Sequence, residues 1–184
     1  IQLNKKDTGM KLVYHPHPAL LKQVQPFDFD KLDAIEIEKQ MVDIMTKEHG
    51  VGLSANQVDL DAQIFVMEPK ELQGYKDGQS FAVINPKIEK VSEQTIIGEE
   101  GCLSFPGLFF KVKRAVALVA KFLDSSGKEC IVEFTGWNAR IFQHEFDHLY
   151  GINYIDRVSK LKIDMAKKKQ EKLMKQIKGM IKYG

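Results

Sequence analysis

His144-Glu145-Phe146-Asp147-His148 is the stretch that decides how the rest of this chain of 184 residues is interpreted. On a helix, residues four positions apart lie on one face, so His144 and His148 can bind a single metal ion. Glu145 lies about 100° around the helix, where it can reach a water at the ion without binding the ion itself. The pattern predicts a metal-binding helix, and the alternative is a solvated helix with two ordinary histidines.

The sequence around this motif predicts an α+β fold, in which mixed or antiparallel β-sheets pack around the HExxH helix and a further helix ends the chain. The motif helix is expected from about 136 to 150 and the last helix from about 160 to 181. Runs rich in β-branched and aromatic residues predict five strands, and Asp124-Ser125-Ser126-Gly127 predicts a hairpin turn. The expected strands are Ile64–Met67, Phe81–Ile84, Ile88–Val91, Ala115–Phe122 and Cys130–Phe134.

The N-terminal part is expected to be extended from Leu12 to Val24, with an amphipathic helix after it from Lys31 to Lys47. This helix should end at His49-Gly50, where glycine permits left-handed backbone geometry. The residues expected on its buried face are Leu32, Ile35, Met41, Val42 and Met45.

Composition is typical of a globular protein, with 43% apolar and 28% charged residues and no apolar run of membrane-spanning length. We expect a single catalytic domain over residues 1–184 and a monomer. Two cysteines are too few for a disulfide scaffold, so a reducing compartment fits better. The net charge of +2 hides a basic tail, because residues 157–184 carry ten Lys or Arg against two Asp or Glu.

The motif supplies two metal ligands, and the third has to come from elsewhere. A metzincin site would place a histidine where Tyr154 stands, and a thermolysin-like site would need Glu171 in the basic tail. Cys102 is the better candidate, because a thiolate is a strong ligand and Gly101 lets the backbone approach an ion. Cys130 lies within an expected strand and is interpreted as a core residue.

A glycine-rich stretch, Gly50–Gln57, predicts a loop whose backbone can approach a ligand. It lacks the Lys-Ser/Thr ending of a phosphate loop. Gln57 is the side chain that could donate an amide N–H to a developing oxyanion. An ordinary connection between helix and strand is the alternative.

Together these segments resemble the peptide deformylase family, whose pattern is GxGLAAxQ, then EGCLS, then QHExDHLxG. This sequence reads GVGLSANQ, EGCLS and QHEFDHLYG, in that order, over Gly50–Gln57, Glu100–Ser104 and Gln143–Gly151. The one clear departure is Ser54 in place of alanine, a change that should not alter the chemistry. The likeness covers nearly the whole chain.

The resemblance implies hydrolysis of the N-formyl group of nascent formylmethionyl chains. Cys102, His144 and His148 would hold one divalent ion, Fe²⁺ in many native members and Zn²⁺ or Ni²⁺ in others. Glu145 would be the general base, with Gln57 and the Leu103 backbone N–H as oxyanion donors. Substrate-binding positions would be Gly50, Val51, Gly52, Glu100, Gly101, Trp137, Arg140 and Ile141, with Gly98 at the rim of the pocket. Arg114 would pair with Asp147 to orient the catalytic helix.

The expected C-terminal helix has apolar residues spaced for one face and lysines elsewhere; the apolar set is Leu161, Met165, Leu173, Ile177 and Ile181. It is interpreted either as a helix packed on the domain with a solvated cationic face, or as an attachment to ribosomal RNA. A membrane surface is a weaker alternative.

Two other functions are considered for the whole chain: a zincin endopeptidase, and a catalytically silent RNA-binding relative. The implied location is the cytoplasm, or an organelle after removal of a transit peptide.

Overall fold

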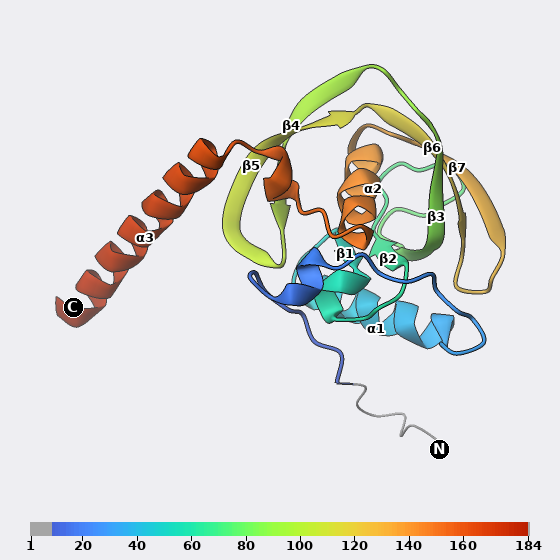
Figure 1. The fold of residues 1–184 in the computed structure, drawn as a ribbon, viewed down its shortest axis with the longest axis horizontal. Helices are drawn as coiled ribbons and strands as arrows, with labels where there is room; N and C mark the ends of the chain where they lie inside the picture. The colour runs from blue at the N-terminus through green and yellow to red at the C-terminus, as the bar shows by residue number, and fades with distance from the viewer. Residues whose placement is uncertain (1–8, 184) are drawn as a thin grey trace.

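The helix that carries the HEFDH motif, α2 (Gly136–Leu149), lies at the centre of the molecule, with β-strands around it (Figure 1). The structure is a computed structural model that describes residues 9–183. Ten of the fourteen residues of α2 are buried, including His144, Glu145 and His148. The motif helix is therefore a core element rather than a surface helix.

One side of α2 packs on a five-stranded sheet in which all neighbouring strands are antiparallel. Phe142 of α2 contacts Phe65 and Phe134 of the sheet, with ring centroids 5.2 and 4.8 Å away. These three side chains are fully buried and anchor the helix on the sheet. The strand order is β1 (Gly52–Ser54), β2 (Ile64–Met67), β3 (Phe81–Val91), β6 (Ala117–Leu123) and β7 (Glu129–Thr135).

A second, two-stranded sheet arches past the other side of α2 (Figure 1). It consists of β4 (Thr95–Cys102) and β5 (Phe105–Ala115), which pair from Thr95↔Ala115 to Cys102↔Phe105. Burial alternates along most of β5, so this strand has one core face and one solvent face. The hairpin ends beside α2 and thereby brings Cys102 to the histidines.

The N-terminal helix, α1 (Ala34–Lys47), is shorter than predicted, because Asp33 caps it by accepting a hydrogen bond from Glu36 N. Met41 and Met45 are fully buried as expected. The prediction was wrong for Ile35, which is 64% exposed. The helix ends at Lys47 as predicted, but His49, rather than Gly50, takes the left-handed conformation after it, with φ 58°.

The strand predictions need three corrections. The two short strands expected between 81 and 91 form the single strand β3, which runs through Asn85 at φ 48° with a register shift after Ile84. The glycine-rich loop contains a short strand, β1, followed by the 3-10 helix η2 (Ala55–Val58). The hairpin β4–β5 was not predicted at all, whereas the turn at Asp124–Gly127 is confirmed, with Asp124 N donating to Lys128 O.

Two more 3-10 helices, η1 (Pro18–Leu21) and η3 (Tyr154–Arg157), lie near the ends of the body. The last helix, α3 (Lys160–Tyr183), projects away from it (Figure 1). Only its beginning touches the core, through Ile163 and Ala166. Among the described residues, no helix combines the length and apolarity needed to cross a membrane.

Candidate functional site

Three potential metal ligands converge between the end of β4 and the middle of α2. Atoms of Cys102, His144 and His148 that can bind metal all lie within 4.8 Å of one another. The Cys102 Sγ atom is 3.5 Å from Nε2 of His148. One thiol and two imidazoles form a donor set suited to Zn²⁺ or Fe²⁺, and the chain's geometry therefore fits a divalent ion at this point.

His144 is oriented by a buried carboxylate. Its Nδ1 atom lies 2.9 Å from Glu100 Oε1, which is the arrangement that directs the other ring nitrogen toward a metal. Burial alone would lower the pKa of His144, but hydrogen bonds with Cys102 and Glu100 raise it to about 10. Burial alone would raise the pKa of Glu100, but hydrogen bonds from His144 and Arg114 lower it to about 2.

Glu100 also binds two arginines, which fixes its position. Arg114 donates Nε and Nη2 to the two carboxylate oxygens at 2.9 Å each. Arg140 donates Nη1 to Oε2 at 2.7 Å and to the Val112 carbonyl at 2.8 Å. Both arginines are buried, so Arg140 is paired rather than solvated. Gly98 makes room for Arg140, because a Cβ at this position would lie 2.9 Å from the guanidinium carbon.

Asp147 connects this network to the end of α2. Arg114 Nη1 lies 2.6 Å from Asp147 Oδ2, the pairing that the resemblance implied. Arg157 adds a second pair of hydrogen bonds to the same carboxylate, at 2.7 and 2.9 Å. Sequence reasoning missed Arg157, because it was counted among the basic residues of the tail.

Glu145 lies beside the ligands with no direct hydrogen-bond partner for its Oε2 atom. Its Oε1 atom is 3.9 Å from His144 Nε2. Burial raises the pKa of Glu145 to about 7, because the charged form loses hydration. A carboxylate in this condition can both accept and release a proton near neutral pH.

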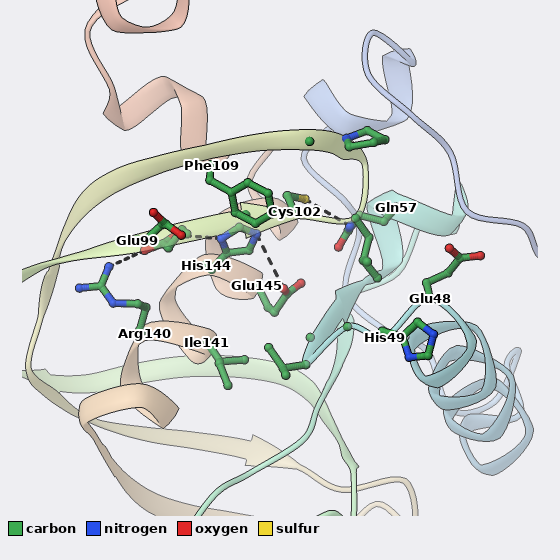
Figure 2. Close-up of a pocket in the computed structure, with 18 of the residues that line it drawn as sticks. Glu48, His49, Gln57, Glu99, Cys102, Phe109, Arg140, Ile141, His144 and Glu145 are labelled. Carbon is green, nitrogen blue, oxygen red and sulfur yellow. Dashed lines mark hydrogen bonds and ion pairs between the residues drawn. The ribbon is translucent and has the colours of Figure 1, made fainter. Parts of the chain in front are cut away.

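Gln57 points its amide at the same space (Figure 2). Its Nε2 atom donates to Cys102 Sγ at 3.4 Å and to Ser104 Oγ at 3.1 Å. Its Oε1 atom accepts from the Ser54 backbone N–H at 3.0 Å and from the Ser54 hydroxyl at 3.3 Å. Ser54 therefore fixes which end of the amide faces the site.

These groups open into a cavity of about 540 Å³ that separates β1 from the tip of the β4–β5 hairpin. Phe109 borders the same space (Figure 2). Its ring covers Gly101, where an added Cβ would be 2.5 Å away. Every substrate-binding position inferred from the resemblance lines this cavity; the eight are Gly50, Val51, Gly52, Glu100, Gly101, Trp137, Arg140 and Ile141. Leu103 lines it too, whereas Gly98 does not.

Lining residues that were not singled out come mainly from the rim. The added charged or aromatic residues are Tyr14, Glu48, His49 and Glu99. They belong to segments distant in sequence, and no local pattern distinguishes them from ordinary surface residues.

Tyr154 occupies the core rather than a ligand position. Its hydroxyl donates to the Leu108 carbonyl at 2.6 Å, and its ring packs 5.6 Å from the ring of His144. This position excludes a metzincin arrangement with Tyr154 as a ligand.

Comparison with known proteins points to one family. The family model described as polypeptide deformylase matches residues 10–164. A rice protein named peptide deformylase 1B, chloroplastic is 40% identical over 153 residues, which are 82% of this chain and 55% of that protein. The peptide deformylase of Thermotoga maritima strain MSB8 is 37% identical over 164 residues, covering 88% of this chain and 94% of the relative. The chain spans 55 to 61% of the length of the two plant relatives that it matches.

Solved structures agree with the sequence matches. A plant peptide deformylase 1B crystal structure has a TM-score of 0.80 at 33% identity, covering 98% of this chain and 95% of that one. A peptide deformylase from Thermotoga maritima has a TM-score of 0.73 at 36% identity, covering 82% and 97%. The α+β architecture predicted from the sequence is therefore confirmed.

Proposed function

Because this chain belongs to the polypeptide deformylase family, we propose that it hydrolyses the N-formyl group of formylmethionyl polypeptides and releases formate. The observation that carries this proposal is the convergence of Cys102, His144 and His148 beside the buried carboxylate of Glu145. A formyl group is the smallest acyl group, so a narrow space beside the three ligands would favour it over longer acyl groups.

The family is metal-dependent, and the three ligands would hold one divalent ion. We propose Fe²⁺ as the native ion, with Zn²⁺ or Ni²⁺ able to replace it in purified protein. When bound, such an ion polarises a carbonyl oxygen and lowers the pKa of an attacking water.

Glu145 moves the proton during the reaction. Its carboxylate takes a proton from the water that attacks the formyl carbon. It then returns the proton to the departing amine nitrogen, which leaves formate and a free methionine N-terminus. The pKa of about 7 suits both steps, because the carboxyl group changes protonation state easily near neutral pH.

Gln57 and Leu103 would bind the negative charge that develops on the formyl oxygen. The Gln57 Nε2 atom already lies 3.4 Å from the Cys102 sulfur and is therefore next to the reacting centre. Ser54 holds the amide oxygen on the opposite side and Ser104 accepts one N–H, so the N–H that contacts Cys102 Sγ is the one that would turn to the formyl oxygen. The backbone N–H of Leu103, which follows Cys102, would be the second donor.

The methionine side chain would lie against Val51, Trp137 and Ile141, which line the cavity beside the ligands. Val51 and Trp137 are 39% and 48% exposed, so both have apolar surface for a substrate to cover.

Formate release from formyl-Met-Ala-Ser tests the activity. The metal-loaded protein should release formate, whereas Glu145→Ala should lose at least a hundredfold in kcat while still binding Zn²⁺. Cys102→Ser should lose both activity and tight metal binding. Cleavage of an internal peptide bond with no formate release would instead indicate an endopeptidase.

For α3 we propose attachment to ribosomal RNA. The apolar face predicted to pack on the domain is exposed along the helix, with Leu161, Met165 and Ile181 at 63 to 76%. The start of the helix packs through Ile163 and Ala166 instead. The sequence of α3 contains nine lysines and only two acidic residues, so the helix carries a net positive charge that suits contacts with phosphate groups. Pelleting with ribosomes should fall after truncation at Val158 and should weaken as salt rises. Binding that is independent of both would contradict this proposal.

We further propose that the chain works as a monomer where nascent chains begin with formylmethionine, in a cytoplasm or in an organelle. The name of the rice relative places that protein in chloroplasts, and the name of the Arabidopsis thaliana relative places that one in chloroplasts or mitochondria. Size-exclusion chromatography coupled to light scattering tests the oligomeric state, for which 21.0 kDa is expected.

A further inference from the structure

Two buried polar atoms at the C-terminal end of α2 have no hydrogen bond of ordinary geometry. They are Nδ1 of His148 and Oδ1 of Asn153. His148 is fully buried and Asn153 is 3% exposed, so neither atom can rely on bulk water. An unsatisfied buried polar group costs about 1–3 kcal/mol, which favours a pairing between complementary atoms.

The orientation of the Asn153 amide is fixed by its other contacts. Its Nδ2 atom donates to the Leu20 carbonyl at 3.1 Å, and a carbonyl can only accept. Its backbone N–H donates to Asp156 Oδ2 at 2.8 Å. The nitrogen end of the amide is therefore committed to Leu20, and Oδ1 is left as an acceptor.

The Asn153 side chain acts on the imidazole of His148. This side chain is a hydrogen-bonding neighbour of the ring, and Oδ1 is the atom of the amide that remains for this contact. A histidine binds a metal ion through an unprotonated ring nitrogen, so a His148 that binds through Nε2 carries its ring proton on Nδ1.

We propose that Asn153 is a positioning residue for His148: its Oδ1 accepts a hydrogen bond from Nδ1–H and fixes the tautomer in which Nε2 is free to bind the ion. Nε2 is the atom that lies 3.5 Å from Cys102 Sγ, on the side of the other ligands. This inference rests on the proposed metal site and adds to it the residue that fixes the tautomer and orientation of the second histidine.

The two histidine rings would then be oriented by different kinds of hydrogen-bond acceptor. His144 has a carboxylate partner, Glu100, whose negative charge is shared with two arginines. Asp147, the acidic residue nearest to His148 in sequence, is occupied by Arg114 and Arg157. An amide oxygen orients His148 without adding another charge to the site.

Asn153 is also the N-cap of η3, where its side chain faces the Asp156 backbone N–H in a capping box, so a purely structural role as the cap of that short helix has to be separated from positioning. Asn56 provides a matched control. It is equally buried, its Nδ2 donates to the carbonyls of Ala19 and Lys22 in the segment that contains Leu20, and its Oδ1 is likewise unpaired.

The first measurement uses the metal-free wild-type protein labelled with ¹⁵N-histidine. Two-bond ¹H–¹⁵N ring spectra should show His148 with its proton on Nδ1. A proton on Nε2 would overturn the proposal. This result does not depend on activity or on metal binding, so it separates failure of this inference from failure of the proposed function.

The second measurement is Zn²⁺ affinity by competition with a chelator. Asn153→Leu should bind Zn²⁺ 10- to 100-fold more weakly and should populate the other His148 tautomer. Asn153→Asp keeps an acceptor oxygen for His148 and should bind Zn²⁺ within about threefold of wild type, but it should lower thermal stability because the Leu20 carbonyl loses its donor. Asn56→Leu should lower thermal stability but leave the Zn²⁺ affinity and the tautomer unchanged. Wild-type affinity in Asn153→Leu, or an equal loss in Asn56→Leu, would show that Asn153 only supports the fold.

Discussion

Gly52 lies directly against the side chain of Glu145, and this contact leaves no room for any larger residue. A Cβ at Gly52 would be 2.6 Å from Glu145 Oε1 and 2.9 Å from its Cδ and Cγ atoms. Since Glu145 is buried, its carboxylate could avoid such a Cβ only by leaving the position that faces the substrate.

We therefore expect Gly52→Ala to lower kcat by about a hundredfold, the cost of displacing a reacting group by roughly an ångström. Circular dichroism and Zn²⁺ content should stay as in wild type, because only one side chain has to move. Gly179→Ala is the control, since a Cβ there meets nothing within 4 Å. Wild-type kcat in Gly52→Ala would mean that the position of Glu145 is not critical.

Glu100 makes the free energy of unfolding of the metal-free protein depend on pH in the acidic range. Its pKa is about 2 in the folded protein and near 4.5 when unfolded, so its stabilisation is complete above pH 4.5 and is lost as the pH falls toward 2. Between pH 6 and pH 3 this group should remove about 2 kcal/mol from the free energy of unfolding.

Urea unfolding at the two pH values measures this loss. In Glu100→Gln the drop from pH 6 to pH 3 should be smaller by about the same amount, although the variant is less stable throughout because two arginines lose their partner. An identical pH dependence in both proteins would argue against a depressed pKa of Glu100.

At the scale of single elements, the β4–β5 hairpin is held in place by Tyr154 of η3. The Tyr154 hydroxyl donates to the Leu108 carbonyl at 2.6 Å, and its ring packs on Phe105 and Phe110. One residue thus links the hairpin to the end of the catalytic helix.

Tyr154→Phe should lower the free energy of unfolding by about 1–2 kcal/mol, because the buried carbonyl of Leu108 loses its donor. Tyr150→Phe is a suitable comparison, since Tyr150 is 42% exposed and should change stability by less than about 0.5 kcal/mol. Equal effects of the two substitutions would be inconsistent with this role of Tyr154.

The elements that the sequence predicted well are those specified by local patterns. The spacing of His144 and His148 identified α2, and the turn residues at 124–127 identified the hairpin between β6 and β7. β4 and β5 escaped prediction because Gly98, Gly101, Pro106 and Gly107 interrupt them, and their pairing with each other compensates for weak local propensity.

Within the site, the motif residues were predictable from the sequence, but the residues that hold them in position were not. The motifs named Cys102, Gln57 and Glu145, which the structure brings together around one cavity. Arg157 and Asn153 follow the motif helix, but their partners depend on how the chain turns back after Gly151 at φ 74°. No spacing rule in the sequence specifies that turn.

On the scale of the whole molecule, α3 divides into a part that belongs to the body and a part that does not. Ile163 and Ala166 pack on the core, and Gln170 Nε2 donates to the Pro106 carbonyl at 3.1 Å. Beyond Gln170, the apolar side chains are exposed; these include Leu173, Met174, Met180 and Ile181.

A truncation after Glu171 should therefore leave the melting temperature and the hydrolysis of formyl-Met-Ala-Ser unchanged. Truncation at Val158 should lower the melting temperature by several degrees, since it uncovers the surface beneath Ile163 and Ala166 and removes about 2 kcal/mol of burial. Differential scanning calorimetry distinguishes the two. An equal drop for both truncations would place the distal half of α3 on the body.

The position of the ligands gives a bound ion a mechanical role as well as a chemical one. Cys102 ends a strand of the two-stranded sheet, whereas both histidines belong to α2, so the ion would act as a cross-link between two separate layers. Zn²⁺ at a thousandfold excess over its dissociation constant should add about 4 kcal/mol to stability, and Cys102→Ser should abolish this gain in thermal melts.

Hydrogen exchange would locate the effect. Removing the ion should speed exchange at the tip of the β4–β5 hairpin, from Cys102 to Phe110, more than in the five-stranded sheet. That tip carries Phe109 and one wall of the cavity. Loss of the ion would therefore increase the mobility of this cavity wall as well as remove the activity. Limited proteolysis should then cleave the metal-free protein at this tip.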